Sequence, residues 1–266
     1  MESLCRDLRE EHESLDRMVA PLTETDWDKA TPFADWTIRD EITHLTYFDG
    51  AGLLSATDTA GFAKHIEELI KNFNHFEDDY LQAGRSLSSS ALLSRWREDR
   101  EALLQVLMTL NPKQRLPWYG PPMSARSFVT ARMMETWAHG QDVADALEVE
   151  RIATDRLRHV AHIGVTTFGW SYANRGMNIP DSPVRVELTS PGGDNWNWGP
   201  EDAENTVHGR ALDFCLVVTQ RRHVEDMDLV TTGNVAQEWI KLAQAFAGPP
   251  EMGPAPGRFR KKRRIA

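Results

Sequence analysis

The chain has 266 residues, of which 41% are hydrophobic and 26% charged, and its net charge is −10 with histidine counted as neutral. This is the composition of a soluble folded protein with room for two domains; the negative charge argues against general nucleic-acid binding, and no apolar run is long enough for a transmembrane helix. Residues 1–13 are densely charged and lack the apolar stretch of a secretory signal, and the cysteines Cys5 and Cys215 stand in unlike contexts, which predicts a cytoplasmic protein without disulfides.

Helical periodicity runs through the first part of the chain, up to about residue 175, and predicts a helical bundle there. The first helix is expected over residues 3–22. His12 lies within it between Glu11 and Glu13, and this charged setting indicates a surface position.

The second helix is expected over residues 38–56. Thr37 has the position of its N-cap, and Asp40 stands three residues later, where the second member of a capping box belongs. An apolar stripe follows, formed by Ile38, Ile42 and Leu45. His44 lies next to this stripe, so we expect it at the edge of a core-facing surface. Residues 47–49, Tyr-Phe-Asp, come one turn later and could line a pocket.

A third helix is expected over residues 59–85 and a fourth over residues 91–110. The third contains His65 and His75, which are ten positions apart and therefore do not stack as a pair. We interpret both as ordinary polar residues.

Residues 116–122, Leu-Pro-Trp-Tyr-Gly-Pro-Pro, form a connection whose prolines restrict the backbone. It could form one wall of a substrate site, or it could seal the end of the bundle, and the sequence does not decide between these roles. The helix that follows, with Ser124 or Ser127 as its cap, is expected to reach about residue 148. A further helix over residues 155–174 is expected to close the bundle domain.

Glu135 and His139 stand four residues apart on that long helix, so both side chains leave the same face. A carboxylate and an imidazole placed in this way can hold one divalent cation. A third ligand must come from elsewhere, and His44 is the best candidate. Asp142, three residues after His139, could orient an imidazole in such a site, or it could pair with a nearby arginine.

Residues 180–248 differ in character and predict a small α+β domain. Alternating residues in 182–189 and 196–199, separated by a Pro-Gly-Gly turn, indicate a hairpin, and a third strand is expected over residues 205–208. Helices are expected over residues 210–222 and 235–246.

Several residues of this part have two interpretations. Trp196 and Trp198 could stack on a flat ligand, but packing in a small core is the favoured interpretation. The run 221–223, Arg-Arg-His, suits the end of a helix and could instead bind a carboxylate substrate. Cys215 lies on an apolar helix face and is expected to be an inert thiol. Residues 249–266 form a basic tail, for which a solvated, disordered state is favoured over a dedicated nucleic-acid or membrane contact.

Two short segments, residues 36–45 and 135–147, resemble the mycothiol-dependent maleylpyruvate isomerase family, which belongs to the DinB-like superfamily of metal-binding helical bundles. The resemblance covers roughly the first 175 residues as an arrangement of helices. It implies that His44, Glu135 and His139 bind a divalent metal, usually taken to be zinc. The order of the domains is also similar, and residues 213–223 resemble an actinobacterial branch of the family that is named for metal binding rather than for a reaction.

Three protein ligands would leave a coordination position open, as in catalytic zinc sites. The chain offers no convincing nucleophile, and the resemblance implies that mycothiol, a low-molecular-weight thiol, supplies one. The first hypothesis is therefore a metal- and thiol-dependent isomerase or S-transferase of a small electrophile, without a membrane partner. The second is a non-catalytic metal-binding or stress-related scaffold. The sequence names neither the substrate nor the metal, and it leaves a homodimer open.

Overall fold

The computed structural model describes residues 1–33, 35–72 and 75–259. Contacts between Cα atoms divide the chain into two compact units, Met1–Arg151 and Ile152–Ala266. No helix in the described ranges is both long enough and apolar enough to cross a membrane.

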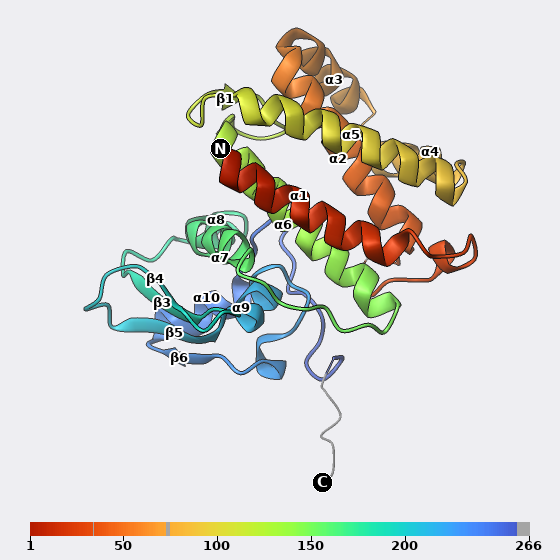
Figure 1. Cartoon of the computed structure of the whole chain (residues 1–266). Helices are drawn as coiled ribbons and strands as arrows, with labels where there is room; N and C mark the ends of the chain where they lie inside the picture. Colours follow the sequence, from red (N-terminus) through yellow and green to blue (C-terminus); the bar gives the residue numbers. More distant parts are fainter. Residues whose placement is uncertain (34, 73–74, 260–266) are drawn as a thin grey trace. The chain divides into compact units, whose positions relative to one another are not determined.

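Unit 1 is a helical bundle (Figure 1). Its helices are α1 (Glu2–Val19), α2 (Ile38–Thr57), α3 (Thr59–Lys71), α4 (Phe76–Arg85), α5 (Ser89–Thr109) and α6 (Ala125–Ala146), with a 3-10 turn, η1 (Asp26–Asp28), after α1. The helices α1, α2, α5 and α6 pack against one another, and α3 and α4 pack against α2. Fully buried side chains from these helices form the core, among them Leu15, Trp27, Ile38, Ile42, Leu45 and Trp96.

The bundle confirms the predicted fold class, with three differences of detail. The expected third helix is two helices, because α3 ends at Lys71 and α4 begins at Phe76. Two short strands, β1 (Arg115–Leu116) and β2 (Met123–Ser124), pair in antiparallel fashion on either side of the proline-rich connection. This pair is a β element within the part of the chain for which the sequence predicts a helical bundle.

His12 is the third difference, because it is buried with 1% exposure rather than on the surface. It follows Leu8 and precedes Leu15 on the inward face of α1, and helical position decides burial here more than the glutamates beside it do. Its ring meets the ring of Trp96 edge to face, with centroids 6.0 Å apart. Neither ring nitrogen has a hydrogen-bond partner among the described residues.

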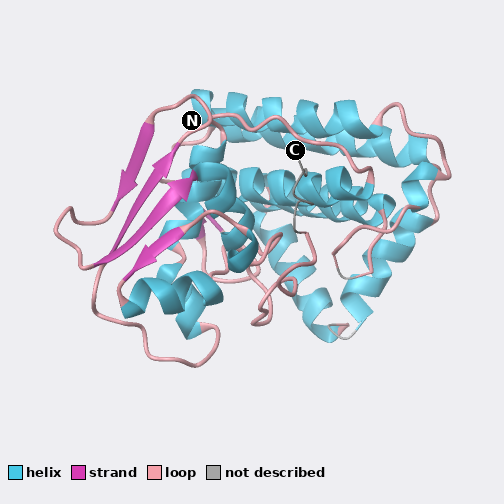
Figure 2. Cartoon of the chain, turned by 90° about the horizontal axis from the view of Figure 1, so that it is seen from below, coloured by secondary structure: helices cyan, strands magenta, loops and turns pink. Residues whose placement is uncertain are grey.

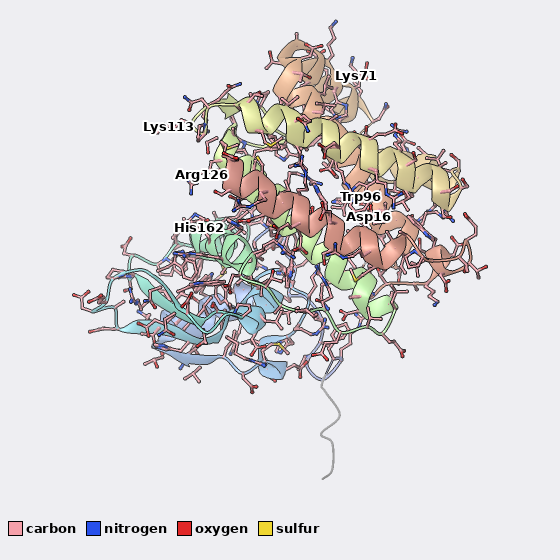
Figure 3. All side chains as sticks on the ribbon, in the orientation of Figure 1. Asp16, Lys71, Trp96, Lys113, Arg126 and His162 are labelled. Carbon is pink, nitrogen blue, oxygen red and sulfur yellow. The ribbon has the colours of Figure 1, made fainter. Side chains whose placement is uncertain are left out.

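Charged groups lie near this buried histidine. Arg100 donates to Asp16 at 2.6 Å and stacks over Trp96 at 4.1 Å; Figure 3 labels Asp16 and Trp96. Arg132 of α6 donates to Asp49 of α2 at 2.9 Å, and both side chains are at most 3% exposed. The bundle interior therefore contains ion pairs as well as apolar side chains.

Unit 2 is a small α+β fold. It consists of α7 (Leu157–Thr166), α8 (Phe168–Ala173), β3 (Val184–Thr189), β4 (Asn195–Trp198), β5 (Asn205–Arg210), α9 (Ala211–Val218), η3 (Val224–Asp226), β6 (Val230–Thr232) and α10 (Asn234–Leu242). The strands form one sheet in the order β4-β3-β5-β6 (Figure 2). The predicted hairpin is β3–β4, with Leu188 opposite Trp196, while β5 runs parallel to β3.

Residues 152–175 belong to unit 2 and not to the bundle, where we had placed them. They form α7 and α8, of which α7 packs on α9 and α8 on α10. The contact is close at Gly164, where a Cβ atom would come within 2.6 Å of Val218 and 3.1 Å of Phe214. The apolar face of α7 is covered by α9. Helical periodicity alone does not identify this partner.

Of the two interpretations of the hairpin tryptophans, the structure favours packing in a small core for Trp196. Trp196 is 5% exposed and lies in the core, while Trp198 is half-buried and donates from Nε1 to His162 at 3.3 Å. Cys215 is a buried free thiol, as is Cys5 in unit 1. Most of the basic run at the end of the chain, residues 260–266, lies outside the described residues.

Candidate metal centre

Two capped helices position the candidate ligands. Thr37 accepts from the backbone N–H of Asp40, and the Asp40 carboxylate accepts from the backbone N–H of Thr37 at 3.0 Å, so the predicted capping box is formed. It sets the start of α2 and places His44 in its second turn. Ser124, rather than Ser127, caps α6, which carries Glu135 and His139 in its middle.

The structure brings the three predicted residues together. One ligand atom from each of His44, Glu135 and His139 lies within 4.8 Å of the others. The Nε2 atoms of His139 and His44 lie 3.2 Å and 3.5 Å from the same carboxylate oxygen, Oε2 of Glu135. Tetrahedral zinc with bonds of about 2.0–2.1 Å holds its ligand atoms about 3.3 Å apart. The spacing of these atoms therefore fits one metal ion.

The protonation states also fit. Burial, with a smaller effect of the neighbouring His139, lowers the pKa of His44 to about 3, so this imidazole is neutral at neutral pH. Burial by itself would raise the pKa of Glu135, but the hydrogen bonds with His139 and His44 outweigh it and hold that pKa well below its usual range. A neutral imidazole and an ionised carboxylate are the forms that bind a metal.

A second carboxylate lies on the other side of His139. Oε2 of Glu41 lies 2.6 Å from Nδ1 of His139, and Glu41 is fully buried. Its other oxygen accepts from the Thr31 hydroxyl at 2.7 Å. A neutral imidazole can donate through only one nitrogen. Since both nitrogens of His139 face carboxylate oxygens, one further proton, on the imidazole or on a carboxylate, or else a metal ion at Nε2 is needed at this point.

Glu41 therefore lies next to the imidazole, in a position of the kind that the sequence suggested for Asp142. Asp142 is buried as well, and a carboxylate oxygen of Asp142, one of Glu41 and a ring nitrogen of His139 all lie within 4.8 Å of one another, so an orienting role of Asp142 stays a prediction. Burial and then the charge of Asp142 raise the pKa of Glu41. Glu41 stands three residues before His44, on the same side of α2, and this spacing was the signal in the sequence that could have revealed it.

Aromatic side chains enclose the two histidines. Nδ1 of His44 lies 3.2 Å from the hydroxyl of Tyr80, whose pKa is raised, chiefly by burial. Trp36 stacks on His139 with ring centroids 5.9 Å apart, and Phe48 lies 4.6 Å from His44. These contacts hold both rings with Nε2 directed at Glu135.

The proline-rich connection shares features of both predicted roles. The carbonyl of Pro117 accepts from Ser55 of α2 at 2.6 Å, and Trp118 stacks on Phe62 of α3, so the connection packs firmly on the bundle. Tyr119 continues the aromatic enclosure, since its ring lies 5.5 Å from that of Phe48. His65 also contacts Tyr119, at 2.8 Å, and is therefore not the ordinary polar residue that the sequence indicated.

A helical bundle with a His–Glu–His cluster between its second and sixth helices, joined to a small α+β unit, defines a DinB-like protein of the maleylpyruvate isomerase type. Residues 8–144 match the family model for the mycothiol maleylpyruvate isomerase N-terminal domain, and the chain belongs to this family. Residues 180–232 match a second model, described as wyosine base formation.

The chain is also similar to curated proteins and to solved structures. The chain is 46% identical over 247 residues to Uncharacterized protein Rv0036c of Mycobacterium tuberculosis strain H37Rv and to Uncharacterized protein MT0041 of strain CDC 1551, covering 93% of this chain and 96% of each relative. Crystal structures of the mycothiol-dependent maleylpyruvate isomerase and of a mutant of it give TM-scores of 0.54 and 0.56 at 14% identity. They cover 83% and 86% of this chain and 89% and 92% of their own, and at this identity they establish the fold alone.

Proposed function

We propose that the chain is a divalent-metal-dependent enzyme that uses a low-molecular-weight thiol, mycothiol or one like it, for isomerisation or S-transfer on a small electrophile. The observation that carries the proposal is the meeting of His44 Nε2, His139 Nε2 and Glu135 Oε2 at one point. Zinc is the metal that this set of donors suits best. The solved structures that share the fold of this chain are of a mycothiol-dependent maleylpyruvate isomerase, and mycothiol is such a thiol.

The two cysteines of the chain support an external nucleophile. Cys5 and Cys215 are both buried, and burial raises the pKa of each thiol, which keeps it protonated and unreactive. A thiol bound from solution would be activated if a bound metal lowered its pKa. Free, buried cysteines also suit a reducing compartment, and we place the reaction in the cytoplasm.

The residues of the chain would have separate tasks in this reaction. Glu41 would keep the proton of His139 on Nδ1, and Tyr80 would fix the ring of His44, so that both Nε2 lone pairs face the metal position. The aromatic side chains would limit the access of water. The external thiolate would add to a carbon–carbon double bond conjugated to a carbonyl, the new single bond would rotate, and expulsion of the same thiolate would restore the double bond with no net change of atoms.

The experiment combines metal analysis with an activity screen. The purified chain, loaded with zinc and freed of excess metal, should hold about one equivalent and consume a conjugated enone only when a thiol is present. Removal of the metal by a chelator should abolish the activity, and zinc should restore it. Tightly held metal without turnover across a panel of thiols and electrophiles would favour the non-catalytic scaffold instead.

A further inference from the structure

A second polar cluster lies beside the metal centre, where α2, α3 and the connection 116–122 meet. We define the tyrosine–histidine cluster as Tyr47, His65 and Tyr119. The hydroxyl of Tyr47 lies 3.1 Å and that of Tyr119 lies 2.8 Å from the same atom, Nε2 of His65. All three side chains are half-buried, so none of them is fully enclosed in the bundle core.

The cluster cannot use all of its hydrogen-bonding capacity internally. An imidazole nitrogen either donates one hydrogen or accepts one, while each hydroxyl has one hydrogen and two lone pairs. If Nε2 carries the proton, one hydroxyl hydrogen has no acceptor within the cluster. If Nε2 is the acceptor, both hydroxyl hydrogens can be used, but oxygen lone pairs remain. The first tautomer can therefore donate to one more carbonyl or hydroxyl oxygen, and the second can accept from one more hydroxyl group.

The cluster is electrically neutral. Burial lowers the pKa of His65 and is the main cause that raises those of Tyr47 and Tyr119, so the imidazole is uncharged and both phenols keep their hydrogens at neutral pH. Arginines around the metal centre are already engaged with carboxylates: Arg132 with Asp49, Arg85 with Asp40, and Arg39 with Glu24 and Asp28. These groups suit a neutral oxygen better than a second carboxylate.

Aromatic rings connect the cluster to the metal centre. Phe48 lies 5.5 Å from Tyr119 on one side and 4.6 Å from His44 on the other. Tyr47 stacks on Tyr80 at 4.8 Å, and the Tyr80 hydroxyl contacts His44. One layer of rings therefore separates the cluster from a candidate metal ligand, and Tyr47, Phe48 and Tyr119 are all half-buried.

From these contacts we infer that Tyr47, His65 and Tyr119, with the ring of Phe48, recognise the carbonyl or hydroxyl oxygen of a small, uncharged, planar electrophile whose reactive carbon lies toward His44. The assignment of the reactive end rests on the proposed function. The recognition of the neutral planar portion rests on the cluster alone. The substrate class is thus a neutral conjugated carbonyl compound rather than a dicarboxylate.

The test measures binding by titration calorimetry with 3-hydroxyacetophenone, a neutral aromatic probe that carries both oxygen types, and with maleate as the dicarboxylate comparison. Tyr119→Phe and Tyr47→Phe each remove one hydroxyl and keep the ring, and each should weaken probe binding about five- to tenfold, the range of a neutral hydrogen bond. Phe48→Leu should also weaken it. Tyr172→Phe, at a buried tyrosine of unit 2, is the matched control and should leave it unchanged.

Two further arms separate this inference from the proposed function. The metal-free His139→Ala variant should bind the probe within about twofold of the wild type, because the cluster does not include that residue. Circular dichroism and Tm show whether each variant is folded. If one tyrosine variant does not fold, the other still tests the inference. Absence of probe binding, equal binding by both tyrosine variants and the wild type, or a preference for maleate would each overturn the inference, whatever the outcome for metal and thiol.

Discussion

Glu41 and His139 stand 98 residues apart in the sequence, yet the carboxylate of one lies 2.6 Å from Nδ1 of the other. This contact directs the opposite nitrogen of His139 at Glu135. It joins α2 to α6 through a buried hydrogen bond and orients one member of the i,i+4 pair on α6.

Glu41→Gln should weaken zinc binding about 10- to 100-fold, the usual effect of removing a group that orients a metal-bound histidine. The amide can still accept a hydrogen bond from Nδ1, but it lacks the charge that increases the basicity of the imidazole. Competition with a chromophoric chelator measures the affinity. Glu67→Gln, at an exposed glutamate of α3, is the matched control. Unchanged zinc affinity in the Glu41 variant would remove this residue from the site.

His139→Ala should abolish zinc retention and thiol-dependent activity while the chain stays folded, because one of the three proposed ligands is lost and the bundle core is formed by other side chains. Its Tm should fall, since Glu41 loses a buried partner. Metal analysis, circular dichroism and the activity assay are compared with His75→Ala, at an exposed histidine.

Each result of this comparison has a distinct meaning. A folded, metal-free and inactive protein supports the catalytic interpretation. An unfolded protein indicates that the metal is structural, because such metals supply folding free energy. Full metal content and activity would mean that His139 is not a ligand.

His12→Phe should stabilise the protein, and more so in acid. Burial lowers the pKa of His12 well below 6.5 in the folded state, while the unfolded chain takes up the proton near 6.5. The wild type therefore has its full stability above pH 6.5 and loses up to about 1.4 kcal/mol per pH unit from this group as the pH falls below that value. Phenylalanine does not titrate, and it removes two buried nitrogens that lack partners.

Urea unfolding between pH 5 and 8 measures the difference between the His12 variant and the wild type. The free energies of unfolding should differ by about 1 kcal/mol at pH 8, from the removal of unpaired polar atoms, and by more at pH 5. Taking the difference cancels the contributions of other groups that titrate in this range. Parallel curves for the two proteins would show that His12 keeps its ordinary pKa in the folded state.

Gly164→Ala should destabilise unit 2 by about 1–3 kcal/mol, although alanine is the better helix former. Its Cβ would come within 2.6 Å of Val218, so α7 and α9 would have to separate. Gly169→Ala in α8 is the control, because its Cβ would meet Ile179 at an ordinary 3.4 Å. Thermal unfolding compares the two. If Gly164→Ala proved as stable as the wild type, α7 would not pack closely on α9.

Local patterns were sufficient for much of the fold and for part of the site. The capping box at Thr37 and Asp40, the spacing of Glu135 and His139 and the alternation in β3 each depend on residues a few positions apart, whose geometry follows directly from helix or strand periodicity. His44 was paired with that helix through the resemblance to a family. The helical class of unit 1, the hairpin of unit 2 and the three candidate ligands could therefore be predicted from the sequence.

Features that depend on a partner distant in the sequence became evident only in the folded chain. His12 is buried because α5 brings Trp96 against it, and α7 belongs to unit 2 because Phe214 and Val218 cover it. His65 has a hydrogen-bond partner because the connection 116–122 places Tyr119 next to it. The role of Glu41 is of the same kind. Periodicity states which face of a helix a residue occupies, but it does not state which other helix covers that face, and burial, pKa and hydrogen bonding all follow from that second fact.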